Sequence, residues 1–340
     1  NAKIISLGIG DTTLPLLSHI TQGLIEESKA LGTKKGYSGY GDEQGLTQLR
    51  KKISENIYKG IVKPEEVFVS DGAKCDIARL QVMFGKNVSV AIQDPAYPVY
   101  VDGSVIIGAT GEYNQAKEHF DKIAYMKCAP ENKFFPDLKK VPRTDLIYFC
   151  SPNNPTGAAS TKEELKSLVD FAKKNKSIII FDAAYSFFIR NKTLPTSIYE
   201  IEGAKEVAIE ISSFSKPAGF TGVRLGWTVV PEGLKFDDGT PIIKDWNRVM
   251  TTLFNGASNI AQYGGLAALD DIGLKEMQKT IDYYLENTRL IKEALDSMNI
   301  KTYGGVNAPY IWAYFPGKKS WDVFEKILEK SFVVTTPGAG

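Results

Sequence analysis

The strongest constraint on the fold is an alternation of short apolar runs with helical segments between residues 60 and 230. Residues 178–182, Ile-Ile-Ile-Phe-Asp, are apolar up to the last position, as in a strand that is buried on both faces of a parallel sheet. Because strands that alternate with helices favour an α/β fold, we predict a mainly parallel central sheet flanked by helices. The other strands are expected at residues 67–70, 88–92, 146–150, 207–211 and 225–230.

Two helices are predicted between these strands, over residues 73–84 and 162–175. The second begins with a capping-box pattern, in which Ser160 or Thr161 is followed three residues later by a glutamate. Such a box satisfies backbone N–H groups that the first turn of a helix leaves without partners. The pattern therefore predicts where this helix begins.

The C-terminal part of the chain has a different pattern. Residues 240–300 are helical throughout, and residues 301–334 mix a strand at 310–315 with a helix at 321–330. We therefore expect a second, smaller α+β domain, built from this part and from the N-terminal arm. The expected division is residues 35–285 for the large domain, and residues 1–34 with 286–340 for the small one.

Charge and hydropathy exclude several classes of protein. The net charge is +1, and acids and bases are mixed along the chain, so there is no basic stripe that would predict a nucleic-acid partner. No apolar run approaches the roughly 20 residues that span a bilayer, so no membrane partner is expected. No secretory signal is visible. The chain starts at Asn1 and stops in a turn-rich loop, so we expect a piece of a longer protein, which leaves both a bacterial cytoplasm and a plastid stroma open.

Cysteine and histidine are scarce. The cysteines, Cys75, Cys128 and Cys150, lack CxxC spacing, which is evidence against a disulfide framework and a zinc site and favours a reducing compartment. The two histidines, His19 and His119, are typical of ordinary surface or helix positions. We therefore expect no metal site and no histidine-based nucleophile, and any catalysis has to come from a cofactor.

The segment that most strongly indicates a reactive site is Ser-Phe-Ser-Lys at residues 213–216, which is followed by an arginine eight residues later. Lys216 can bind an aldehyde covalently. Ser213 and Ser215 can donate hydrogen bonds to a phosphate, and the planar fork of Arg224 can hold the same phosphate. The alternative is a surface loop with an ordinary lysine and arginine.

Polar residues also follow two of the predicted strands. Asp182 ends a strand, where α/β proteins place functional groups. Its carboxylate could pair with the protonated pyridine nitrogen of a bound cofactor, and Tyr185 could reach a hydroxyl on the same pyridine ring. The turn at residues 150–157 presents Asn154 to a ring oxygen. The alternatives are an aspartate that caps a helix and an ordinary β-to-α turn.

A further turn, Ser-Asp-Gly-Ala-Lys at residues 70–74, lies between a strand and a helix. The free N–H groups of a helix N-terminus bind phosphate, so Ala73 and Lys74 are expected there. Lys74 could also meet a substrate carboxylate. After the next strand, Tyr97 could stack on a flat ring or simply pack in its loop.

In this order, these motifs resemble the class I and II aminotransferases of fold-type I, and the resemblance covers nearly the whole chain. It implies that pyridoxal 5'-phosphate (PLP) is the cofactor, held by Lys216, and that amino acids and 2-oxo acids are the substrates. It further implies that Lys216 moves the proton on the substrate Cα, with Asp182 and Tyr185 as the other catalytic residues. The whole cofactor set is Tyr40, Ala73, Lys74, Tyr97, Asn154, Asp182, Tyr185, Ser213, Ser215, Lys216 and Arg224.

A closer resemblance is to the group of this family that acts on LL-diaminopimelate, carried by residues 8–13, 36–45, 70–76, 93–98, 219–227 and 254–258. It implies transamination between LL-2,6-diaminopimelate and 2-oxoglutarate, with tetrahydrodipicolinate and glutamate as the other pair, in lysine biosynthesis. It implies a homodimer in which Tyr40 and Asn255 serve the neighbouring subunit. The substrate set is Gly10, Glu43, Lys74, Tyr97, Asn154 and Asn255. The arginine with which this family grips the substrate α-carboxylate has no counterpart before Gly340.

Three alternatives stay open at this point, and a fourth is disfavoured. A related lysine-type aminotransferase would share the cofactor site and differ in its amino donor. Another PLP reaction, such as β-elimination or decarboxylation, would release different products. A non-catalytic PLP-binding regulator usually carries a DNA-binding segment, and none is seen. A nicotinamide dehydrogenase is disfavoured because Gly8-Ile-Gly10 lacks the rest of a GxGxxG motif.

Overall fold

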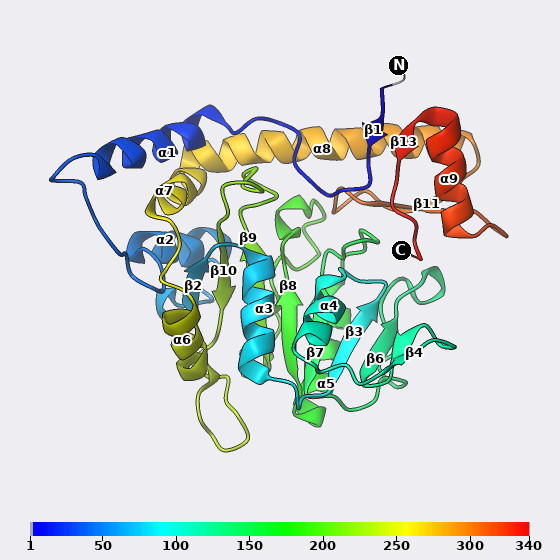
Figure 1. Ribbon diagram of the computed structural model, residues 1–340, viewed down its shortest axis with the longest axis horizontal. Coiled ribbons are helices and arrows are strands. Elements are labelled where there is room, and N and C mark those ends of the chain that lie inside the picture. The colour runs from blue at the N-terminus through cyan, green and yellow to red at the C-terminus, as the bar shows by residue number, and fades with distance from the viewer. Residues whose placement is uncertain (1–2, 340) are drawn as a thin grey trace.

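The central sheet of the computed structural model, which describes residues 3–339, has seven strands in the order β2-β10-β9-β8-β7-β3-β6 (Figure 1). Strand β10 runs antiparallel to both of its neighbours, and the other strands are parallel. The predicted α/β fold with a mainly parallel sheet is therefore confirmed. The strands are β2 (Val67–Ser70), β3 (Val90–Asp94), β6 (Ile123–Lys127), β7 (Leu146–Cys150), β8 (Ile178–Asp182), β9 (Ala208–Ser213) and β10 (Gly226–Val229).

Helices cover both faces of this sheet because successive strand residues point to opposite sides. In β8, Ile179 and Phe181 share one core with residues of α5, whereas Ile180 belongs to the core that contains Ile77 of α3. The helices next to the sheet are α2 (Thr47–Lys52), α3 (Ala73–Phe84), α4 (Val99–Ile106), α5 (Lys162–Asn175) and α6 (Ile242–Leu253). Short 3-10 turns at 64–66, 130–132, 186–188, 198–200 and 204–206, and a π turn at 53–57, complete the loops.

The predicted capping box at the start of α5 is confirmed. Thr161 Oγ1 accepts a hydrogen bond from the Glu164 N–H at 3.2 Å, and Glu164 Oε2 accepts one from the Thr161 N–H at 2.8 Å. Of the two residues considered for the cap, the structure therefore uses Thr161 rather than Ser160.

The N-terminal and C-terminal segments meet at one end of the long helix α8 (Asp271–Ser297) (Figure 1). Their strands are β1 (Ile5–Ser6), which pairs in parallel with β13 (Val333–Val334), and β11 (Lys301–Gly304), which pairs with β12 (Ile311–Tyr314); β4 (Tyr113–Asn114) and β5 (His119–Phe120) form a separate hairpin. The remaining helices are α1 (Ser18–Leu31), α7 (Asn259–Ala268) and α9 (Ser320–Ser331).

Helix α8 also contains the expected domain boundary between residues 285 and 286. The division into two domains stays a prediction. None of the helices within residues 3–339 combines the length and the apolar character that crossing a bilayer requires.

Helix α4 was not predicted, and its sequence explains why. Val-Tyr-Val-Asp-Gly-Ser-Val-Ile is rich in β-branched residues and carries a glycine, both of which disfavour a helix. Tertiary contacts compensate: Gln81 of α3 donates from Nε2 to the carbonyl of Tyr100 at 3.1 Å, and a side chain at Gly103 would collide with Gln81. The close packing of α4 on α3 therefore decides the local structure.

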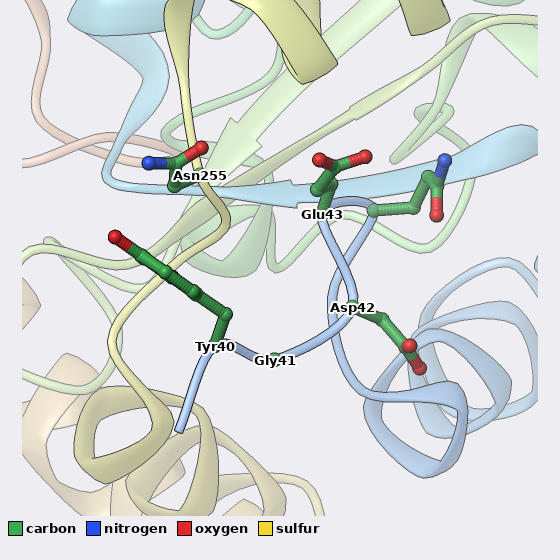
Figure 2. A pocket seen from close by; sticks show the side chains of 6 residues that line it. Tyr40, Gly41, Asp42, Glu43 and Asn255 are labelled. Carbon is green, nitrogen blue, oxygen red and sulfur yellow. The ribbon is translucent and has the colours of Figure 1, made fainter. Parts of the chain in front are cut away.

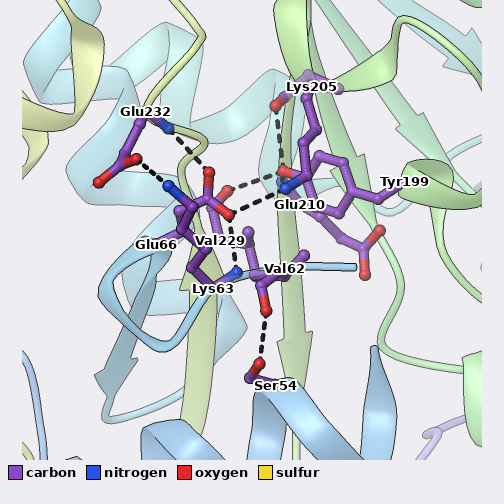
Figure 3. Close-up of polar contacts among 10 residues, drawn as sticks. Ser54, Val62, Lys63, Glu66, Tyr199, Lys205, Glu210, Val229 and Glu232 are labelled. Atoms are coloured by element: carbon purple, nitrogen blue, oxygen red, sulfur yellow. Dashed lines mark hydrogen bonds and ion pairs between the residues drawn. The ribbon is translucent and has the colours of Figure 1, made fainter. Parts of the chain in front are cut away.

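A carboxyl group lies buried in the middle of the sheet, at Glu210 of β9. Tyr58 Oη donates to its Oε1 at 2.9 Å, and Ser197 Oγ donates to its Oε2 at 2.6 Å. Figure 3 shows Glu210 beside Tyr199, whose hydroxyl accepts from the Glu210 N–H at 3.1 Å. Burial outweighs these donors and raises the pKa of Glu210 from 4.5 to about 7.

This raised pKa predicts a pH-dependent effect of Glu210→Gln. Between the unfolded pKa near 4.5 and the folded pKa of about 7, the folded protein keeps a proton that the unfolded chain has released. The wild-type free energy of unfolding therefore falls as pH rises through this window, by an amount on the order of 3 kcal/mol, and glutamine removes that loss. Denaturant unfolding at pH 5 and pH 8 measures the difference. The exposed Glu202→Gln is the control, and a Glu210→Gln effect that is equal at both pH values would contradict the prediction.

Candidate active site

Lys216 follows β9 and is partly buried at the sheet edge where the parallel strands end. Its Nζ donates a hydrogen bond to the carbonyl of Gly10 in the N-terminal arm. Burial lowers the pKa of Lys216, and the positive charges of Arg224 and Lys74 lower it further, against the opposing charge of Asp11. A lysine with a lowered pKa spends more of its time as the neutral amine, which is the form that attacks an aldehyde.

A pair of serine hydroxyls lies next to Lys216. Both serines are buried, and Ser213 Oγ donates to Ser215 Oγ at 2.8 Å. In the sheet register, Gly226 of β10 lies opposite Ser213 on one side and Ser70 on the other. This register brings the serine pair close to the turn that precedes α3.

The start of α3 has the features of a phosphate site. Its first residues are Ala73 and Lys74, and Gly72 before them has φ +126°, in the region that favours glycine. A Cβ at Gly72 would collide with the guanidinium of Arg224, so that group lies directly against the turn. Free helix N–H groups, a guanidinium and hydroxyls together form a site for a dianion.

Asp182 is the last residue of β8 and is 5% exposed. Its Oδ1 accepts from the Ala184 N–H at 3.0 Å, and its Oδ2 accepts from Tyr100 Oη at 2.7 Å. Burial raises the pKa of Asp182, and these two hydrogen bonds and the charge of Lys216 counteract that rise. Asp182 is thus a buried carboxyl group held by two donors at the strand end, and the residue that caps the following 3-10 turn is Tyr185.

Tyr185 connects the sheet to the C-terminal part of the chain. Its hydroxyl hydrogen-bonds to the hydroxyl of Tyr310, and the two ring centroids are 5.0 Å apart. A Cβ at Gly10 would collide with the Tyr310 hydroxyl and contact that of Tyr185. The structure therefore brings Gly10, Lys216 and Tyr185 together from three distant segments.

The turn after β7 is held by its own side chains. Asn153 Oδ1 accepts from the Thr156 N–H at 3.1 Å and from Thr156 Oγ1 at 2.8 Å. Asn154 is half-buried, and its side chain makes no hydrogen bond to any residue within 3–339, which leaves its amide open to a ligand. Tyr97 lies on the loop after β3, and its ring centre is 5.7 Å from the Nζ of Lys74 in α3.

Three other predicted residues, Tyr40, Glu43 and Asn255, form a second group. They line one cavity of about 320 Å³, and Figure 2 shows Tyr40 and Asn255 on different segments of the chain beside it. The rest of the lining is Gly41, Asp42 and Gln44. Tyr40 is 86% exposed, and within residues 3–339 no hydrogen bond connects the three to Lys216 or Asp182. Neither Lys216 nor Asp182 is among the residues that line this cavity.

Two tyrosines at the site were not predicted. Tyr100 follows Tyr97 by three residues, a helical spacing that could have indicated a shared face, but the segment was not recognised as a helix. Tyr310 lies directly before strand β12, and no local motif connects it with Tyr185.

Comparison with known proteins gives a consistent result over the whole chain. The family model for aminotransferase class I and II matches residues 2–340. A rice (Oryza sativa subsp. japonica) protein described as a probable chloroplastic LL-diaminopimelate aminotransferase is 58% identical, over 100% of this chain and 73% of its own length. The LL-diaminopimelate aminotransferase of Protochlamydia amoebophila (strain UWE25) is 54% identical, over 100% of this chain and 83% of its own.

A solved structure gives the same family. The L,L-diaminopimelate aminotransferase from Chlamydomonas reinhardtii is 58% identical and superimposes with a TM-score of 0.96, over 100% of this chain and 83% of that one. Together with the family model, these likenesses cover both the sheet and the segments that frame Lys216. The chain therefore belongs to the class I and II aminotransferases.

Proposed function

We propose that this aminotransferase holds PLP on Lys216 and interconverts LL-2,6-diaminopimelate and 2-oxoglutarate with tetrahydrodipicolinate and glutamate, in lysine biosynthesis. The assignment of PLP is supported by one observation, which is that Lys216, Asp182 and a phosphate site lie together at one edge of the sheet. The substrate rests on identities of 54–58% to relatives named for it.

The donor set fits the chemical groups of PLP. Its phosphate matches the start of α3 together with Ser213, Ser215 and Arg224. Its ring nitrogen matches Asp182, and its aldehyde matches the amine of Lys216. When bound, PLP supplies an electron sink that stabilises negative charge at the substrate Cα.

The remaining steps, which are proton transfer and orientation of the reacting groups, depend on residues of the chain. Lys216 has a lowered pKa, so its amine can accept the Cα proton and return it at a neighbouring carbon. The Gly10 carbonyl receives a hydrogen bond from Lys216 Nζ and so orients that amine. Tyr185 and Tyr310 close the site on the side of the C-terminal part of the chain. Asp182 stabilises positive charge on its ligand through an ionised carboxylate.

A homodimer is part of this proposal. Tyr40 and Asn255 lie beside one cavity whose lining does not include Lys216, and Tyr40 is largely exposed. In a dimer these residues, with Glu43, can serve the site of the neighbouring subunit, with Tyr40 at the phosphate and Glu43 at the distal ammonium of the substrate. We further propose the plastid stroma or a bacterial cytoplasm as the location, because the similar rice protein is described as chloroplastic and another relative is bacterial.

An absorbance spectrum tests the proposal directly. Purified protein loaded with PLP is expected to show the yellow band of a lysine-bound cofactor, to lose it on addition of LL-diaminopimelate and to regain it with 2-oxoglutarate. L-Lysine as the donor is the control for a lysine-type enzyme. A band that does not change on addition of LL-diaminopimelate would refute the proposed substrate. The absence of any band would refute the proposed cofactor.

A further inference from the structure

Tyr100, in the first turn of α4, is 1% exposed, and its hydroxyl donates to Asp182 Oδ2 at 2.7 Å. Burying a tyrosine hydroxyl is costly unless it is hydrogen-bonded, and here the partner is a carboxylate at the sheet edge. The ring has two further neighbours. Its centre lies 5.9 Å from that of Tyr97, at right angles, and 5.2 Å from that of Tyr148, nearly parallel.

The hydrogen bond from Tyr100 determines how the carboxylate of Asp182 lies. One oxygen is held by the Ala184 N–H, and within residues 3–339 the donor to the other is Tyr100. Without the hydroxyl, the second oxygen would be free to turn, and burial would favour protonation of the group. Charge-assisted hydrogen bonds of this length are among the strong ones in proteins.

The same ring also fixes the residue expected on the face of the cofactor. Tyr97 sits just before α4 and contacts the ring of Tyr100 edge to face. Tyr100 is itself held by its backbone, since its carbonyl accepts from Gln81 Nε2 at 3.1 Å and from Ser104 Oγ at 2.7 Å. Helix α4 therefore presents Tyr100 as a fixed element between Tyr97 and Asp182.

We propose that Tyr100 is a positioning residue that orients the Asp182 carboxylate toward the ring nitrogen of the cofactor and sets the ring of Tyr97 against the cofactor face. This inference rests on the proposed binding of PLP. It assigns to one buried tyrosine the alignment of two side chains that meet the cofactor from different directions.

Other titratable groups face Asp182 as well, and the test has to separate them from Tyr100. They come from several elements: Cys150 at the end of β7, Tyr185 after β8, Lys216 after β9, and Tyr310 before β12. Within residues 3–339 none of them donates a hydrogen bond to the carboxylate of Asp182. Removing the Tyr100 hydroxyl alone leaves all of them in place.

Tyr100→Phe, with Tyr148→Phe as its matched control, tests the proposal. Tyr148 stacks on Tyr100 in the same cluster, and its buried hydroxyl has no hydrogen-bond partner within residues 3–339. For Tyr100→Phe we expect the PLP dissociation constant to rise about tenfold, as for the loss of a hydrogen bond to a charged group. Tyr148→Phe is expected to bind PLP as the wild type does.

The absorbance of the bound cofactor provides a second readout, which a purely structural role would not change. With Asp182 less able to hold positive charge on the ring, the lysine-bound nitrogen should release its proton at higher pH. The pH midpoint of the visible band is therefore expected to move upward in Tyr100→Phe and to stay in place in Tyr148→Phe. Equal affinity and equal midpoints in the two variants would overturn the proposal.

A double-variant cycle covers the case in which Tyr100→Phe weakens the fold, as judged by the unfolding temperature of the cofactor-free protein. In an Asp182→Asn background the hydroxyl has no charged carboxylate to orient, so Tyr100→Phe should add little further loss of PLP affinity. An undiminished loss there would overturn the proposal. Wild-type protein that fails to bind PLP would refute the proposed function instead, which keeps the two failures distinguishable.

Discussion

Lys216→Ala is expected to abolish transamination, with a fall in kcat of at least about 10³-fold, because one substitution removes both the covalent anchor of the cofactor and the base that moves the Cα proton. The structure supports both roles. The amine is held by the Gly10 carbonyl, and its pKa is lowered by burial next to two other cations. Single-turnover measurements with LL-diaminopimelate and added PLP give the rate.

Two controls make this result interpretable. Lys63→Ala removes an exposed lysine that pairs with Glu232 at 2.7 Å, and it should leave the rate unchanged. The unfolding temperature of cofactor-free Lys216→Ala should stay near that of the wild type, since the side chain makes a single hydrogen bond within residues 3–339. Near-normal transamination by a folded Lys216→Ala protein would refute the assignment of the lysine.

Asp182→Ala is expected to slow removal of the Cα proton by at least about two orders of magnitude, which corresponds to about 2.7 kcal/mol of transition-state stabilisation. The buried carboxylate can stabilise positive charge on a ring nitrogen only while it is ionised. The hydrogen bonds from Tyr100 and Ala184 favour that ionised form against burial. Loss of deuterium from Cα-labelled LL-diaminopimelate, followed by mass spectrometry, measures the step.

Asp182→Asn is the companion variant, because it keeps the size of the side chain and removes the charge. Proton exchange as slow as in Asp182→Ala would locate the effect in the charge rather than in packing. Unchanged exchange in both variants would show that the aspartate does not act on the reacting centre, and it would also remove the basis for the role of Tyr100.

The helices and strands that follow local rules could be predicted from the sequence. The bounds of β7, β8 and α5 match the predicted ranges, because each is a strongly patterned segment bounded by turn residues or a capping box. Helix α4 and strand β6 were missed. The first runs against its own helix propensity and is held by contacts with α3, and the second lies at the edge of the sheet, where it pairs with β3.

The sequence by itself determined the α/β class, the family resemblance and the cofactor motifs around Lys216, since each motif is contiguous and its chemistry depends on residue type. Only the tertiary structure decided which distant residues meet them. It brought Gly10 to Lys216, Tyr310 to Tyr185 and Tyr100 to Asp182. Such contacts depend on strand order, register and helix packing, which join segments far apart in the chain and leave no local pattern from which they can be predicted.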